Sequence, residues 1–229
     1  MCANERIVNH VTAKIQKLLI MLLCKNLSYT IQNKKIIDNL TLEVHEGQIV
    51  ALMSSNGSGK TTLLRHLAGL QKPQSGSIYV DNLELDSTIY PKVTMVTQEA
   101  NLYPHLNVKN NILLAAKKIN KFNELVEFFG IKDLLNKFPR ELSGGQKQIV
   151  AFVRAVIIES KYLILDEVTS ALDTHNIELI ESYLLMLKAQ GVGIVLTTHS
   201  FNHAKRISDQ IYILDSGKVA AFGGARLNL

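Results

Sequence analysis

The stretch Gly57-Ser58-Gly59-Lys60-Thr61 constrains the fold more than any other part of the chain. It follows a continuous apolar run, QIVALMS, typical of a strand buried on both faces, and it precedes KTTLLRHLAGL, whose apolar residues recur at helical spacing. Two glycines let backbone N–H groups surround phosphate oxygens, and a helix N-terminus adds partial positive charge. A strand, a glycine-rich loop and a helix in this order predict a phosphate-binding loop in an α/β domain.

The polar residues of this loop have distinct expected roles. Lys60 is long enough to reach the β- and γ-phosphates, and the hydroxyl of Thr61 can bind Mg²⁺. The usual pattern places a glycine six residues before the lysine, and Ser54 stands there instead. Because Ser54 lies where the strand leaves the sheet, before the phosphate cradle, we expect its small side chain to be tolerated. The alternative is an ordinary glycine turn in front of a helix.

The rest of the chain repeats the buried-strand pattern. Further apolar runs indicate strands with helical patterns between them: KVTMVTQ, YLILDE, GIVLTTH and QIYILD. Residues 106–158 show no convincing strand and are expected to be mostly helical. Shorter runs near the glycine loop indicate an antiparallel section: LLCKNLSYTI, KKIIDNLTLEV and GSIYVD. The predicted fold class is α/β, with a parallel core, an antiparallel β section and a helical insert.

Composition and hydropathy exclude several classes of protein. Apolar residues make up 47% and charged residues 20% of the chain, as in an ordinary globular protein. No segment reaches the roughly 20 apolar residues that a membrane helix needs, and residues 1–10 lack the apolar core of a secretory signal. Two cysteines without metal-type spacing fit a reducing compartment, and a net charge of +5 is too small to indicate nucleic-acid binding. If the protein works at a membrane, we expect another chain to supply the span.

Two carboxylates follow one of the predicted buried strands. Asp166 and Glu167 end the run YLILDE, and ligands gather at the carboxyl ends of strands in open α/β sheets. Asp166 would bind Mg²⁺ directly or through water, and Glu167 would orient or deprotonate the attacking water. Acidic residues also end many strands as solvated turns, so the phosphate-binding loop in the same chain is what favours the catalytic interpretation.

A second candidate phosphate cradle lies at ELSGGQKQ. Ser143, Gly144 and Gly145 supply a hydroxyl and two unobstructed N–H groups at the start of an apolar-periodic helix. One chain does not need two cradles for one triphosphate, unless the second serves a nucleotide held by another copy. The alternative is a glycine turn with a serine that caps the helix.

These motifs resemble, in order, those of the ATP-binding cassette (ABC) ATPases. Leu142–Gln146 is similar to the family signature, Asn56–Thr61 to its Walker A motif and Leu163–Glu167 to its Walker B motif. Ser170–Asp173 resembles the D-loop, and Thr198-His199 resembles the switch histidine. Gln98 resembles the Q-loop glutamine. The resemblance covers residues 21–229, with a helical subdomain at about 100–158, and leaves residues 1–20 as an extension of unknown role. It implies a P-loop NTPase (RecA-like) core and the ABC ATPase fold.

The resemblance also implies a mechanism and a set of site residues. Two cassettes would pair head to tail, with ATP between Lys60 of one copy and Ser143 of the other. Glu167, His199 and Gln98 would be catalytic, and Thr61, Gln98 and Asp166 would hold Mg²⁺. The expected nucleotide-binding residues are Tyr29, Ser55, Asn56, Gly57, Ser58, Gly59, Lys60, Thr61, Thr62, Ser143, Gly144, Gly145, Gln146 and Asp173. The implied cofactors are ATP and Mg²⁺.

The chain departs from the family pattern at four positions. Besides Ser54, Ile31 stands where an aromatic residue usually stacks on adenine, and Tyr29, two residues earlier, is the candidate substitute. Ile149 replaces a common arginine, which leaves an apolar residue in an otherwise polar turn that the sequence does not explain. Val168 replaces the proline of the usual DEPT. None of these changes removes a phosphate, metal or water contact.

A single cassette of ordinary size favours a role in transport. The expected partners are a transmembrane permease subunit, a second cassette and a solute-binding protein, at the cytoplasmic face of the cell membrane, without nucleic acid. The segment QEANLYPHLNVKNNI resembles that of importers for polar amino acids. Two alternatives remain open: a soluble ATPase that acts on ribosomes or DNA, and a cassette that binds ATP without hydrolysing it.

Overall fold

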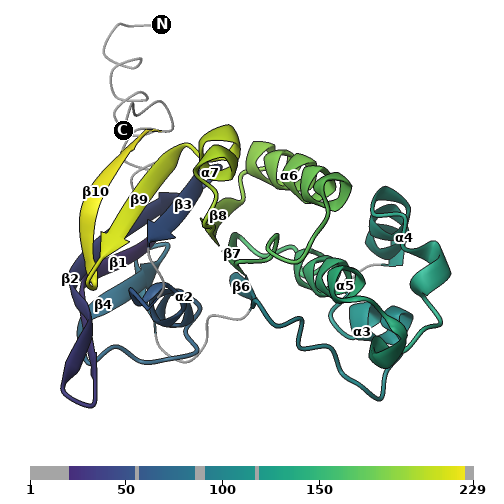
Figure 1. Ribbon diagram of the computed structural model, residues 1–229, viewed down its shortest axis with the longest axis horizontal. Helices are drawn as coiled ribbons and strands as arrows, with labels where there is room; N and C mark the ends of the chain where they lie inside the picture. The colour runs from purple at the N-terminus through teal and green to yellow at the C-terminus, as the bar shows by residue number, and fades with distance from the viewer. Residues whose placement is uncertain (1–20, 55–56, 86–90, 117–118, 225–229) are drawn as a thin grey trace, which may run out of the picture.

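A computed structural model describes residues 21–54, 57–85, 91–116 and 119–224 of the chain, and two β-sheets organise them (Figure 1). The larger sheet has six strands in the order β10-β9-β3-β8-β7-β6. Its strands are β3 (Ile49–Ser54), β6 (Val93–Val96), β7 (Tyr162–Asp166), β8 (Gly193–Thr197), β9 (Gln210–Asp215) and β10 (Lys218–Gly224). All pairs are parallel except β9–β10. The predicted parallel core is confirmed.

The smaller sheet is the predicted antiparallel section. It has four strands in the order β2-β1-β4-β5. Their bounds are β1 (Met21–Ile31), β2 (Lys34–His45), β4 (Ser75–Val80) and β5 (Leu83–Glu84). The chain therefore begins its described part in this sheet, enters the larger sheet at β3 and returns to the smaller sheet at β4.

The helices follow the predicted pattern. They are α2 (Lys60–Leu67), α3 (Val108–Leu113), α4 (Ile119–Phe128), α5 (Gly144–Val156), α6 (Thr174–Ala189) and α7 (Phe201–Ile207). Short 3₁₀ turns cover Lys132–Leu134 and Pro139–Glu141. In Figure 1, α3, α4 and α5 lie at the end of the molecule away from the antiparallel strands, as expected for a helical insert.

The larger sheet is buried on both faces, which explains its continuous apolar runs. Ile49 and Ala51 of β3 belong to a cluster that includes the buried residues of α5, α6 and α7. Val50 and Leu52, the alternate residues of the same strand, belong to a second cluster with α2 and the smaller sheet. Successive side chains of a strand point to opposite faces, so the sheet is the middle layer of the molecule.

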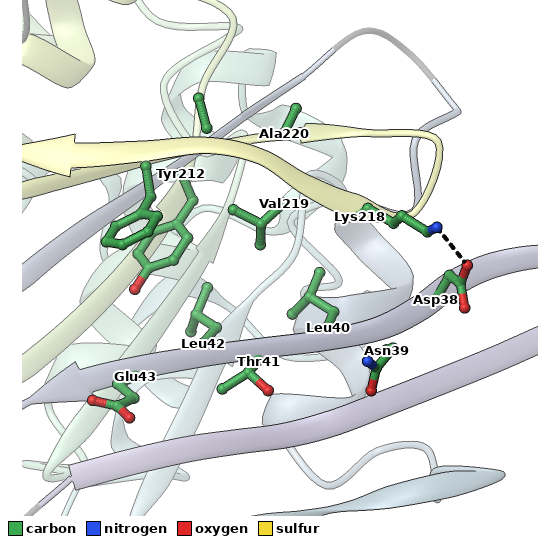
Figure 2. A pocket seen from close by; sticks show the side chains of 12 residues that line it. Asp38, Asn39, Leu40, Thr41, Leu42, Glu43, Tyr212, Lys218, Val219 and Ala220 are labelled. Carbon is green, nitrogen blue, oxygen red and sulfur yellow. Dashed lines mark ion pairs between the residues drawn. The ribbon is translucent and has the colours of Figure 1, made fainter.

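The edge strands β2 and β10 border a groove of about 900 Å³ (Figure 2). Lys218 forms an ion pair of 3.1 Å with Asp38 across it. Phe222 of β10 is exposed and stacks on Tyr212 of β9, with ring centroids 5.6 Å apart. Within the described part of the chain, no helix is long and apolar enough to cross a membrane.

Candidate nucleotide-binding and hydrolysis site

The glycine loop lies between β3, which ends at Ser54, and α2, which begins at Lys60. Gly57 and Gly59 have φ angles of 77° and 94°, in the left-handed region that favours glycine. A Cβ atom on Gly59 would lie 2.6 Å from the carbonyl oxygen of Ile36, so the close approach of β2 also requires glycine there. Both predicted glycines therefore have a backbone reason to be present.

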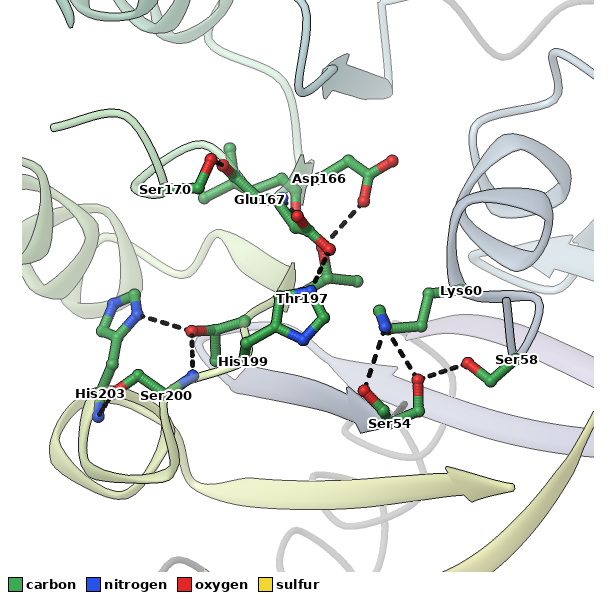
Figure 3. A network of polar contacts seen from close by, with 12 residues as sticks. Ser54, Ser58, Lys60, Asp166, Glu167, Ser170, Thr197, His199, Ser200 and His203 are labelled. Carbon is green, nitrogen blue, oxygen red and sulfur yellow. Dashed lines mark hydrogen bonds and ion pairs between the residues drawn. The ribbon is translucent and has the colours of Figure 1, made fainter. Parts of the chain in front are cut away.

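Lys60 is held inside this loop. It is only 7% exposed, and its ammonium donates hydrogen bonds to the carbonyl and the hydroxyl oxygen of Ser54, at 3.2 and 2.9 Å (Figure 3). The hydroxyl of Ser54 also contacts that of Ser58. Ser54 therefore gives the lysine an acceptor that a glycine would lack. Thr61 is exposed and Thr62 is partly buried, whereas the predicted Ser55 and Asn56 lie outside the described residues.

The first carboxylate after β7 points towards the neighbouring strand. Asp166 is 4% exposed, and its Oδ1 atom accepts a hydrogen bond of 2.8 Å from the hydroxyl of Thr197. The parallel pairing of β7 and β8 places these two residues side by side. The same hydroxyl accepts a hydrogen bond of 2.9 Å from the backbone N–H of Glu167. Sequence reasoning missed Thr197, although its place directly before Thr198-His199 at a strand end is a usable signal.

The second carboxylate meets the predicted histidine. Glu167 has a φ angle of 50°, unusual for a residue other than glycine, and its Oε1 atom lies 2.7 Å from Nε2 of His199 (Figure 3). The Glu167 side chain is 17% exposed and that of His199 is 47% exposed, so the pair is open to solvent on the histidine side. Strained backbone and a carboxylate–imidazole contact at one strand end are typical of a functional site.

Gln98 follows β6 at the same edge of the sheet and is exposed. The segment around it is tied to α5, because Gln148 donates to the carbonyl of Thr97 at 3.2 Å and Arg154 donates to that of Ala100 at 3.2 Å. The structure thus links the segment of Gln98 to a helix of the insert.

The two candidates for the adenine stack lie in different surroundings. The ring of Tyr29 contacts that of His66 on α2 edge to face, at 4.8 Å between centroids. Ile31 is 45% exposed. The pairing of β1 with β2 shifts register on both sides of Tyr29, so simple strand alternation does not relate the two residues. A nucleotide-binding role for Tyr29 stays a prediction.

The Ser143 motif caps α5. The hydroxyl of Ser143 accepts from the N–H of Gln146 at 3.2 Å, and the Gln146 side chain accepts from the N–H of Ser143 at 3.0 Å. A Cβ on Gly145 would lie 3.4 Å from the carbonyl oxygen of Ala171, so this helix start packs on the segment before Asp173. A cavity of about 730 Å³ is lined by Ser143, Gly145, Gln146 and Asp173 together with residues 129–131, 133 and 134. Gly144 has open space around its Cβ position.

The unexplained Ile149 is a core residue. It is 3% exposed and packs in the cluster beneath α5 and α6, as does Val168, which is 4% exposed. The structure explains the apolar residue that the sequence left unexplained, because Ile149 lies in the second turn of α5 and faces the core.

The polar groups at this site fit a nucleotide with its metal ion. Left-handed glycines before a helix, a buried lysine ammonium and a buried carboxylate at the adjoining strand end are the groups that bind phosphates and Mg²⁺. The Glu167–His199 contact places a carboxylate, a group chemically able to act as a base for water, at the same strand end. Fold and site together define a P-loop nucleotide-hydrolysing protein.

Comparisons with known proteins define the family. A model described as ABC transporter matches residues 37–170. The glutamine transport ATP-binding protein GlnQ of Geobacillus stearothermophilus is 34% identical, over 80% of this chain and 82% of the relative. The glutamate/aspartate import ATP-binding protein GltL of Escherichia coli K12 is 31% identical, over 87% of this chain and 89% of the relative. The chain belongs to the ABC transporter family, as one of its ATP-binding proteins, and it is an ATPase.

Solved structures agree with this assignment. An ATP-binding subunit of an ABC transporter superposes with a TM-score of 0.84 at 30% identity, over 89% of this chain and 90% of the other. A dimeric ATP-binding cassette in a post-hydrolysis state with ADP and Pi superposes with a TM-score of 0.81 at 28% identity, over 90% of this chain and 99% of the other. The ABC ATPase fold expected from the sequence is confirmed.

Proposed function

We propose that this ATPase powers a membrane importer for polar amino acids. The observation that carries ATP hydrolysis is the Glu167–His199 contact of 2.7 Å, at the same sheet edge as the glycine loop that holds Lys60. Relatives that share about a third of their residues with this chain are named for glutamine transport and for glutamate and aspartate import. The segment of residues 98–112, which resembles that of such importers, supports the same substrate class.

In this mechanism, the segments that follow neighbouring strands of the larger sheet supply the reacting groups. Lys60 would neutralise the β- and γ-phosphates, and the N–H groups of Gly57 and Gly59 would surround them. Asp166 and Thr61 would hold Mg²⁺ with help from Gln98, and the ion would offset charge on the phosphate oxygens. Glu167 would take the proton from the attacking water, and its contact with His199 would keep the carboxylate in place.

The Ser143 surface supports action as a pair of cassettes. Ser143, Gly145 and Asp173 line one cavity at the start of α5, and the hydroxyl of Ser143 accepts a hydrogen bond from the N–H of Gln146. A second copy in head-to-tail contact would bring its own Lys60 loop to this surface. The dimeric state of a similar cassette supports such a pair.

The test of hydrolysis uses the purified full chain. We expect Mg²⁺-dependent release of phosphate from ATP, and we expect Lys60→Ala to abolish both nucleotide binding and release. Nucleotide binding without turnover, even with the membrane partner present, would refute the hydrolytic role and would favour a cassette that only binds ATP.

The test of transport is the partner that co-purifies from the native cell. Recovery with a permease, and loss of uptake of glutamine or glutamate when the gene is deleted, would support the importer. Recovery with ribosomes or DNA would refute it and favour the soluble ATPase.

A further inference from the structure

A charged cluster with a buried carboxylate and a buried histidine, closed by a largely exposed arginine, joins α6 to α7 behind the proposed catalytic pair. Glu181 of α6 is 6% exposed, and its two carboxylate oxygens accept hydrogen bonds from Nε and a terminal nitrogen of Arg206 on α7, at 2.8 and 2.5 Å. His203, also on α7, is 7% exposed, and its Nε2 atom lies 3.2 Å from the same carboxylate. We call Glu181, His203 and Arg206 the α6–α7 cluster. Buried ionisable groups are costly unless paired, so such a cluster calls for an explanation.

His203 connects this cluster to the residue before His199. Its Nδ1 atom lies 3.2 Å from the hydroxyl oxygen of Thr198, which is itself 6% exposed. Burial lowers the pKa of His203, against the opposing effect of Glu181, so the ring is neutral at neutral pH. Nε2 lies near Glu181 without making a hydrogen bond to it, so the contact that orients the ring is the one at Nδ1, which can accept a hydrogen bond from Thr198 when the proton of the neutral ring is on Nε2.

The Thr198 hydroxyl then shapes the turn that carries His199. Its oxygen accepts a hydrogen bond of 3.1 Å from the backbone N–H of Ser200. The Ser200 hydroxyl in turn accepts from the backbone N–H of His203 at 3.2 Å, which caps the start of α7. His199 lies in the chain between the two residues fixed in this way.

The imidazole of His199 has little packing of its own to orient it. Its side chain is 47% exposed, yet its Nε2 atom is 2.7 Å from Glu167. The backbone on each side of it must therefore supply the orientation. We propose that His203 is a positioning residue, which holds Thr198 and the turn to Ser200 so that His199 meets Glu167.

This proposal rests on the proposed catalytic role of Glu167 and His199, and it differs from a purely structural role. The bidentate Arg206–Glu181 pair already joins α6 to α7. The contact between Nδ1 of His203 and Thr198 adds nothing to that connection. Losing this contact alone should therefore lower the rate of hydrolysis without unfolding the protein.

Two substitutions of His203 separate the effect of the ring's shape from the effect of its Nδ1 acceptor atom. His203→Phe keeps an aromatic ring but has no Nδ1 acceptor, whereas the amide oxygen of His203→Asn lies near the position of Nδ1 and can still accept from Thr198. Displacing a catalytic group by about 1 Å can cost about 10²-fold, so we expect His203→Phe to lower kcat about tenfold or more, with KM for ATP within about twofold. His203→Asn should recover kcat to within about threefold of the unchanged protein. His105→Phe, at an exposed histidine, is the matched control and should leave kcat unchanged.

A double-mutant cycle with Thr198→Val tests whether the effect passes through Thr198. If it does, His203→Phe should have little further effect on kcat in the Thr198→Val background. Equal loss in His203→Phe and His203→Asn, additive losses in the cycle, or a rise in KM that accounts for the loss would each overturn the proposal. Thermal unfolding of each variant, with nucleotide bound and free, identifies any variant that fails to fold. If His203→Phe fails to fold, the kcat values of His203→Asn and Thr198→Val are compared instead.

His199→Ala separates failure of this proposal from failure of the proposed function. If His199→Ala leaves kcat unchanged, the catalytic role of His199 is wrong and the positioning role is wrong with it. If His199→Ala lowers kcat while His203→Phe does not, only the positioning role is refuted.

Discussion

Replacing Glu167 by glutamine removes one proton acceptor and changes almost nothing else. The new amide oxygen can still accept from Nε2 of His199, which lies 2.7 Å from the present carboxylate. The backbone N–H of Glu167 keeps its hydrogen bond of 2.9 Å to Thr197, and the φ angle of 50° suits neither residue better than the other. The substitution therefore isolates the basicity of the side chain.

The loss of kcat expected for Glu167→Gln follows from the chemistry of proton transfer. A positioned general base contributes about 10²–10⁴-fold, which corresponds to about 3–5 kcal/mol in the activation free energy. We expect Glu167→Gln to lower kcat for phosphate release by about 10³-fold, because His199 and Lys60 remain to orient the water and bind the phosphates. Nucleotide affinity should be retained, and ATP-bound dimers should accumulate and elute early in size-exclusion chromatography.

The matched control is Glu127→Gln, an exposed carboxylate on α4. It should hydrolyse ATP like the unchanged protein. A Glu167→Gln enzyme that keeps kcat within about threefold would show that no general base acts at this position, since even a weak base contributes about 10²-fold. The roles proposed for Asp166 and Glu167 at the end of β7 would then have to be reassigned.

Three further substitutions test the surrounding structure. Ser54→Gly removes the hydroxyl acceptor of Lys60 but leaves the carbonyl at 3.2 Å, so the Kd for ATP measured by calorimetry should change by less than about threefold; a large gain in affinity would show that the serine impairs the loop. Tyr162→Phe removes a hydrogen bond of 2.9 Å to Asp81, so the free energy of unfolding in urea should fall by about 1 kcal/mol, with ATPase activity kept. Ile149→Ala leaves a cavity at a residue 3% exposed and should cost about 2–5 kcal/mol in the same measurement, whereas a cost near zero would contradict its place in the core.

The sequence predicted the parallel core well, because strands buried on both faces read as uninterrupted apolar runs. The strand β10 was missed for the opposite reason. Its residues Lys218–Gly224 alternate between exposed and partly buried and end in two glycines, so no apolar run marks it. Ile149 was left unexplained because the residues before it are polar, although the helical period brings it to the face that meets the core. Whether an edge strand forms, or a single helix residue is buried, depends on the element that packs against it, and the sequence alone does not show which element that is.

The site residues also differ in whether the sequence alone could identify them. The residues of the glycine loop are contiguous in the chain, and so are the two carboxylates, so a local pattern is enough to find each motif. Thr197 and His203 act through neighbours on other elements, and their contacts exist only once β7, β8, α6 and α7 are packed together. The only local signal for Thr197 is its place directly before Thr198-His199 at a strand end, and nothing in the residues around His203 distinguishes it.

The two adjacent carboxylates show how one strand end supplies two chemical roles. Asp166 still has the extended backbone of β7, so its side chain turns to the neighbouring strand and becomes buried. Glu167 has a left-handed backbone, which turns its side chain to His199 and the solvent side of the site. The hydroxyl of Thr197 contacts both, donating to Asp166 and accepting from the N–H of Glu167. One hydroxyl therefore restrains the side chain of Asp166 and the backbone of Glu167, so the proposed metal ligand and the proposed base are held in a fixed relation. The two carboxylates nevertheless differ in burial. This difference suits their proposed roles, because the base must reach water whereas the metal ligand need not.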